Sequence, residues 1–186
     1  KVFFTNYDMV QAEIGWIRNA GAYTAEEQPS ISLFNEYFGG GMSSVVFQTI
    51  RESKALAYSS YAYFSKPTSN DKPNTTGAYI GTQADKLDSA IYAMDELLTT
   101  MPQTEVLFSG SKASLLSQIE SERILKEDIL FNYLASKRLG IDYDIRKSVY
   151  EKIPTMNLSD VNAFHQKHLS GKPFNLFIVG SSERIP

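Results

Sequence analysis

Residues 35–59, NEYFGGGMSSVVFQTIRESKALAYS, constrain the fold of this chain more than any other stretch. Apolar side chains recur at helical spacing on both sides of Gly39-Gly40-Gly41, and glycine ends helices. The sequence therefore predicts a helix, a sharp break, a second helix and the start of a strand. Arg51 then ends the second helix and Tyr58 heads the strand. A cation and a phenol on either side of such a tight turn can converge on one oxygen atom.

The three glycines have more than one interpretation. A nucleotide-binding loop needs Gly-Lys-Ser/Thr after its glycines, but Met42-Ser43-Ser44 follows here. Phosphate binding is therefore disfavoured against a left-handed helix cap followed by a sharp turn. A third interpretation, in which the glycines let the backbone approach a ligand closely, stays open at this stage.

The rest of the chain predicts an α+β fold, with helices packed on a largely antiparallel mixed sheet. Residues 1–19 read as extended, and 58–65, 77–82 and 173–180 read as strands, the first two of these three forming a hairpin. Residues 104–140 read as one long helical tract, kinked near 126–128, with Leu115, Leu116, Ile119, Leu130, Tyr133 and Leu134 at its apolar positions. The other predicted helices begin at Ser30 or Ser32, at Ser43 or Ser44 (with Val46, Phe47 and Ile50 inward), after a capping box at Thr82 and Asp85, at Asp144, and at Ser159.

Composition excludes several classes of function. The net charge is −3 and no Lys/Arg cluster stands out, so nucleic acid is not an expected partner. No apolar run is long enough to span a bilayer. Cysteine is absent, which excludes disulfides and thiolate chemistry. The 186 residues suit a single domain, and the chain opens inside a strand, so we expect a part of a longer protein, in a compartment that the sequence leaves undecided.

The two histidines, His165 and His168, do not predict a metal site. A catalytic zinc on a helix takes two His, a third ligand and a Glu that activates water, but Gln166 and Lys167 lie between these two. A surface or partly packed position near the last strand is expected for both. Chemistry of the Ser-His-Asp type has no support for the same reason.

Arg51 and Tyr58 are the remaining candidate site residues. Taken alone, Arg51 reads as a cation that complements a helix C-terminus, and Tyr58 as a strand aromatic. These structural roles are favoured until the surrounding motif is considered.

That motif resembles the second, metal-free half of the pitrilysin/insulinase family of zinc metallopeptidases, which includes insulin-degrading enzyme and the mitochondrial processing peptidase. The matching positions are the glycines, Met42-Ser43-Ser44, Val46-Phe47, Arg51-Glu52 and Leu56-Ala57-Tyr58-Ser59. The stretch 82–98 and the closing strand fit more loosely. The resemblance implies a LuxS/mitochondrial-processing-peptidase-like α+β architecture in which two halves enclose a chamber.

The resemblance also implies a division of labour. The zinc half carries an inverted His-x-x-Glu-His motif, which this chain lacks, so the chain alone should bind no zinc, need no cofactor and be inactive. The expected partners are a zinc-bearing homologous half, on the same or a separate chain, and peptide substrates. Tyr58 is implied to donate a hydrogen bond to the scissile carbonyl, and Arg51 to bind a nearby carbonyl or orient the tyrosine. The alternatives are an inactive assembly domain, like the core subunits of respiratory complexes, and an autonomous peptide-binding module.

Overall fold

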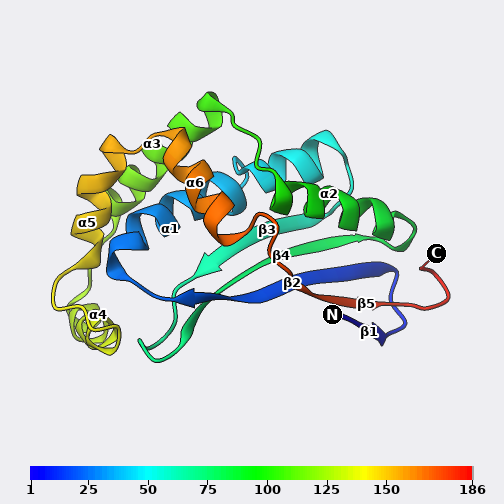
Figure 1. The fold of residues 1–186 in the computed structure, drawn as a ribbon, viewed down its shortest axis with the longest axis horizontal. Helices are drawn as coiled ribbons and strands as arrows, with labels where there is room; N and C mark the ends of the chain where they lie inside the picture. Colours follow the sequence, from blue (N-terminus) through cyan, green and yellow to red (C-terminus); the bar gives the residue numbers. More distant parts are fainter. Residues whose placement is uncertain (186) are drawn as a thin grey trace.

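The computed structural model describes residues 1–185 and shows a layer of helices over one face of a five-stranded sheet (Figure 1). No helix of the described chain covers the opposite face, which we call the bare face. The elements, in chain order, are β1 (Val2–Asn6), β2 (Gln11–Ala22), η1 (Ala25–Glu27), α1 (Gln28–Phe34), η2 (Asn35–Gly39), η3 (Phe47–Ser53), β3 (Ser59–Ser65), β4 (Pro73–Gln83), η4 (Ala84–Lys86), α2 (Leu87–Thr99), α3 (Glu105–Ser121), α4 (Lys126–Arg138), α5 (Ile145–Lys152), η5 (Ile153–Thr155), α6 (Leu158–His168) and β5 (Asn175–Gly180).

The strand order is β1-β5-β2-β4-β3. β1 pairs with β5 in parallel, and all other pairs are antiparallel. The predicted α+β class and the largely antiparallel mixed sheet are therefore confirmed. The predicted hairpin is also confirmed as β3 and β4, although β4 starts at Pro73 rather than at Gly77.

Residues 1–19, predicted to be extended and to supply two or three strands, are extended as predicted, although the second strand continues to Ala22. They divide into β1 and β2, which β5 separates in the sheet. The partner of β1 lies at the other end of the chain, in β5, and nothing local in the sequence indicates such a pairing.

Alternation along the strands separates the two faces of the sheet. In β2, Ala12, Ile14, Trp16 and Ala20 are buried under the helices, whereas their odd-numbered neighbours are exposed or half-buried. The core joins this face to α1, α2 and α6 through the large side chains Leu33, Phe34, Phe38, Phe64, Met94 and Leu169. The helix predicted after residues 82–85 is confirmed as α2, which buries Leu87, Ala90, Met94, Leu97 and Leu98.

Three predicted helix caps are wrong. The first helix begins at Gln28, before Ser30 and Ser32, because Pro29 is preorganised for a first helical turn. The last helix is capped by Asn157 and Asp160, whose side chains each accept the other's backbone N–H, so Ser159 lies inside it. The stretch from Thr82 to Asp85 forms no capping box, since the Thr82 hydroxyl donates to the Leu56 carbonyl 2.5 Å away.

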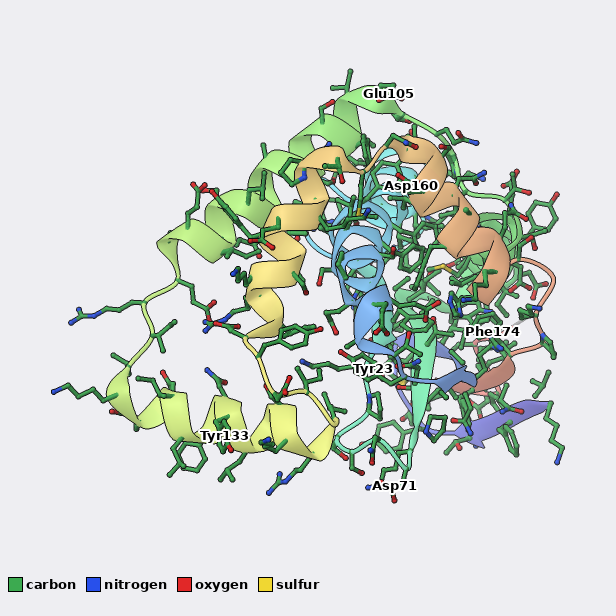
Figure 2. The ribbon with its side chains drawn as sticks, turned by 60° about the vertical axis from the view of Figure 1, so that its left-hand side comes forward. Tyr23, Asp71, Glu105, Tyr133, Asp160 and Phe174 are labelled. Atoms are coloured by element: carbon green, nitrogen blue, oxygen red, sulfur yellow. The ribbon has the colours of Figure 1, made fainter. Side chains whose placement is uncertain are left out.

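The predicted tract over residues 104–140 is two helices, α3 and α4, separated by an extended connection over 122–125 rather than kinked at 126–128. Leu115, Leu116 and Ile119 of α3 are half-buried against the core. The predicted apolar positions of α4 do not contribute to the core, because Leu130, Tyr133 and Leu134 are all exposed. Figure 2 shows α4, with Tyr133 labelled, set apart from the main helix layer.

None of the helices described is both long enough and apolar enough to cross a membrane.

Candidate functional site

The glycine run holds the end of α1 and η2 tightly against the edge strand β3. A Cβ atom at Gly39 would lie 2.0 Å from the carbonyl oxygen of Ala62, a distance that no side chain tolerates. One turn earlier, the Asn35 amide donates to the Phe64 carbonyl (2.9 Å) and accepts the Phe64 N–H (2.7 Å), so it pairs with β3 as another strand would. A close backbone approach therefore exists at Gly39, and its partner is the backbone of β3.

The second helix restarts after Gly41, which has a φ of +77°. The Ser44 hydroxyl donates to the Gly41 carbonyl (2.9 Å) and accepts the Phe47 N–H (3.3 Å), which caps the helix as predicted. Val46 and Ile50 are buried, while Phe47, predicted inward, is only half-buried. The segment η3 winds as a π-helix, a rare form that often occurs at functional sites.

Arg51 lies on the last turn of η3 with 46% of its side chain exposed. Its guanidinium carbon lies 4.8 Å from the centre of the Phe47 ring, one helical turn earlier, and its Nε is 3.9 Å from the Glu52 carboxylate. Stacking on Phe47 restrains the long side chain while its N–H groups face solvent. Arg51 can therefore donate to a carbonyl oxygen of a bound chain.

A strained turn links η3 to β3. Ala55 has a φ of +49°, in the left-handed region that favours glycine. The Lys86 ammonium donates to the Ala55 carbonyl (3.1 Å), and the Leu56 N–H donates to the Ile50 carbonyl (3.0 Å). Together with the Thr82 bond to Leu56, these contacts fix the backbone immediately before Tyr58.

Tyr58 enters β3 with 54% of its surface exposed. Its backbone N–H donates to the Gly81 carbonyl (2.9 Å), which ties it to β4. The side-chain amide of Gln83 donates to the Tyr58 hydroxyl oxygen (2.9 Å). Because the hydroxyl accepts this bond, its own hydrogen is free for a ligand.

The structure places Arg51 and Tyr58 on either side of the turn, where the sequence predicted them. No hydrogen bond or ion pair joins them in residues 1–185, and their joint action on one oxygen stays a prediction. Gln83 is a further candidate that sequence reasoning missed. It follows Tyr58 by 25 positions, and only the β3–β4 register brings the two together.

The histidines, expected at or near the surface, are buried instead. His165 is fully buried among Phe34 and Phe38, and its Nε2 lies 2.9 Å from the Leu97 carbonyl. His168 packs between Phe64 and Phe164, with its Nε2 3.4 Å from Glu27. The aromatic side of α6 faces the core and carries both rings inward. Within residues 1–185 no group of three or more His, Cys, Asp or Glu side chains is arranged to hold a metal ion.

Sequence comparison identifies relatives. The sequence model of the family described as "Peptidase M16 inactive domain" matches residues 2–115. A Bacillus subtilis protein, the uncharacterized zinc protease YmxG, is 26% identical over 162 residues, which are 83% of this chain and 37% of that protein.

Structural comparison agrees. The crystal structure of a peptidase M16 inactive domain from Pseudomonas fluorescens superposes with a TM-score of 0.80 at 16% identity, over all of this chain and 44% of that one. The ferredoxin protease FusC, solved with Arabidopsis ferredoxin, superposes with a TM-score of 0.68 at 16% identity, over 97% of this chain and 20% of that one. The chain thus spans less than half the length of each of these three proteins.

Proposed function

This chain belongs to the family of peptidase M16 inactive domains, and on that premise we propose that it is the substrate-binding, non-zinc half of a zinc-dependent metalloendopeptidase. The chain is one domain of a larger protein, joined to or paired with a zinc-bearing half. The zinc and the general base belong to that half, and this half acts on the substrate backbone.

The observation that carries the proposal is the exposed Tyr58 hydroxyl, which accepts a hydrogen bond from Gln83 and keeps its own hydrogen for a ligand. In amide hydrolysis, negative charge develops on the carbonyl oxygen. A donor fixed before the reaction stabilises that charge without reorganising during it. The bond from Gln83 and the anchored turn fix the phenol in this way, and the bond from Gln83 also strengthens the phenol as a donor.

Arg51 binds a second carbonyl of the same substrate chain. Its guanidinium is planar and presents N–H groups in a fixed fork, and the Phe47 ring limits the directions it can take. A cation beside the developing oxyanion contributes attraction, and its planar N–H groups contribute direction.

Across residues 1–185, no group of ionisable side chains is arranged to hold zinc. The Nε2 atom of each histidine already faces a protein acceptor, Leu97 or Glu27, and both rings are packed in the core. Peptidase activity therefore requires the partner half. The FusC complex, in which a protein of this fold binds ferredoxin, supports polypeptides as the substrate class.

The test uses the assembled protein and a fluorogenic peptide. Tyr58→Phe removes only the hydroxyl, and we expect kcat to fall about 10²- to 10³-fold with KM little changed. Gln83→Leu should cost about tenfold or less, because it removes one neutral hydrogen bond to the phenol. Arg51→Ala should lower kcat/KM, and Arg51→Lys should recover only part of it.

Tyr92→Phe is the matched control, because Tyr92 is an exposed tyrosine on α2. Zinc content and unfolding temperature should equal those of wild type in every variant. Wild-type kcat in Tyr58→Phe and Arg51→Ala would overturn the proposed roles. An assembled protein that contains this chain but has no peptidase activity would favour the assembly domain instead.

A further inference from the structure

The bare face of the sheet carries a row of aromatic rings with one position missing. Strand register aligns one residue from each of the five strands across the sheet. In order across the sheet these residues are Phe3, Phe177, Gly15, Tyr79 and Tyr61. Four of the five are aromatic, and the central one is glycine.

The rings form two stacks. The Phe3 and Phe177 rings are 4.9 Å apart and inclined by 12°, and those of Tyr61 and Tyr79 are 5.2 Å apart and inclined by 22°. Each separation is close to one strand spacing. Phe177 and Tyr79 flank Gly15 on β5 and β4, about 9.5 Å apart as two strand spacings. One further ring between them would continue the row.

The position over Gly15 is open, unlike the other glycines on this face. A Cβ atom at Gly77 would lie 2.3 Å from the Trp16 carbonyl oxygen and 2.9 Å from the Tyr63 hydroxyl, and one at Gly81 would lie 3.0 Å from the Ser59 hydroxyl and 3.2 Å from that of Tyr79. Tyrosines thus cover both of those glycines. A Cβ atom at Gly15 would have no atom within 4 Å. A glycine inside a strand lowers the stability of the fold, and it often marks a place where a ligand or another backbone approaches closely.

The described strands bring one charged side chain to this face. Among the residues of the five described strands, only Glu13 and Arg18 are charged, and Arg18 donates to the His168 carbonyl on the helix side. Glu13 lies two residues from Gly15 on the bare face, near enough to Tyr79 to help raise the pKa of that phenol, which burial mainly raises. A ligand over Gly15 therefore contacts the aromatic rings of Phe177 and Tyr79 and lies near the Glu13 carboxylate.

The gap also lies on the same face as the proposed site. Gln83, which bonds Tyr58, is four residues from Tyr79 along β4. Four residues of strand and one strand spacing place the gap about 14 Å from Gln83, which equals about four residues of extended chain.

We propose that the gap over Gly15 binds one aromatic side chain of an extended peptide substrate, about four residues from the scissile bond, with a neighbouring basic residue paired to Glu13. This inference rests on the proposed function. The occupant is a single aromatic side chain because the gap is one ring wide between two stacked pairs. A basic residue is expected beside it because the one charged side chain that the described strands bring to this face, Glu13, is negative.

The experiment measures binding to the assembled protein after its zinc has been removed with a chelator, so that no peptide is cleaved. The probe is a fluorescent ten-residue Ala/Ser peptide with one Phe and, two positions away, one Lys. Replacing the Phe of the peptide by Ala should weaken binding to wild type at least tenfold. Gly15→Tyr, which fills the gap, should weaken binding of the Phe peptide to the same extent and abolish its advantage over the Ala peptide. Glu13→Gln should remove the preference for Lys over Ser.

Gly110→Tyr is the matched control, because it adds the same side chain in open space on α3 rather than on the bare face, and its affinity should stay within threefold of wild type. Equal affinity of wild type for the Phe and Ala peptides would overturn the inference without using any variant. So would unchanged affinity in a folded Gly15→Tyr protein. Both outcomes leave the effect of Tyr58→Phe on cleavage untouched, so the two proposals fail separately.

Discussion

The contact between η2 and β3 requires a glycine at position 39. The end of η2 meets the backbone of β3 at this residue. A Cβ atom on Gly39 would lie 2.0 Å from the Ala62 carbonyl oxygen, so only the hydrogen atom of glycine fits. The neighbouring glycines have other roles: Gly40 is extended and Gly41 turns the chain at positive φ. The run positions the helix that carries Arg51 against the strand that follows Tyr58.

Gly39→Ala should therefore be strongly destabilising. Backbone lies on both sides of the contact, so neither can move away cheaply, and we expect a loss of about 2–3 kcal/mol. Urea unfolding of the purified protein measures it. Gly15→Ala, in open space and in a strand, should be neutral or slightly stabilising. Equal stability of the two variants would contradict the close approach.

At the same scale, sequence reasoning found part of the candidate site. Arg51 and Tyr58 could be located because a local motif carries both. Gln83 could not, since its contact with Tyr58 depends on the register between β3 and β4. Gly15 could not either, because its significance comes from rings on four other strands.

Among the elements, α4 differs from the other long helices because it buries no residue. Ile129, Leu130 and Phe131 are all more than half exposed, and a hollow of about 400 Å³ separates Ile129 and Tyr133 from the loop before α5. Its apolar residues therefore add little to the stability of this chain.

Phe131→Ser should change the free energy of unfolding by less than about 0.5 kcal/mol, as for an exposed site. Phe34→Ala, which removes a fully buried ring, should cost about 3–5 kcal/mol. Thermal and urea unfolding of both variants test the contrast. A cost above 1 kcal/mol for Phe131→Ser would show that α4 packs more tightly than described.

The elements that sequence predicted best are those whose apolar spacing and core contacts agree, as in α2. The predicted apolar positions of α4 are exposed because this helix has the apolar pattern but no packing partner. The pairing of β1 was not predicted because its partner, β5, is distant in the sequence. The wrongly predicted helix caps have a local cause. Several residues of the types that cap helices lie near these helix starts, and the backbone geometry decides which of them acts as the cap.

The stability of the whole molecule should depend on pH through α6, which links the helix layer to the sheet. Burial lowers the pKa of His165, and mainly burial lowers that of His168 although Glu27 opposes it. Burial acts to raise the pKa of Glu27, but Lys167 and His168 outweigh it and lower that pKa. The neutral histidines and the ionised Glu27 are thus the native forms.

Each group has a lower pKa folded than unfolded, so its contribution is complete above the unfolded value and is lost as pH falls. The free energy of unfolding should decline below about pH 6.5, where unfolded histidine takes up protons, and further below the ordinary pKa of Glu. Each histidine contributes at most about 1.4 kcal/mol per pH unit. Urea unfolding at pH 7.5, 6.5 and 5.5 measures the slope.

His165→Gln keeps a donor for the Leu97 carbonyl but removes the titrating group, so its slope between pH 6.5 and 5.5 should be shallower. Gln166→Ala, at an exposed neighbour on α6, should keep the wild-type slope. Identical slopes in wild type and His165→Gln would exclude this origin.

The pairing of β1 with β5 also sets an order in time. In the part of the chain that the structure describes, β1 pairs with β5 alone, and a ribosome completes β5 about 170 residues after β1, which at about 5–20 residues per second is roughly 9–35 s. For that interval the first strand emerges with Phe3 and Phe4 unpaired, while β2, β3 and β4 can already associate. The outer end of the aromatic row is therefore the last part of the sheet to assemble, and a nascent chain that stops short of β5 leaves it exposed to chaperones and proteases.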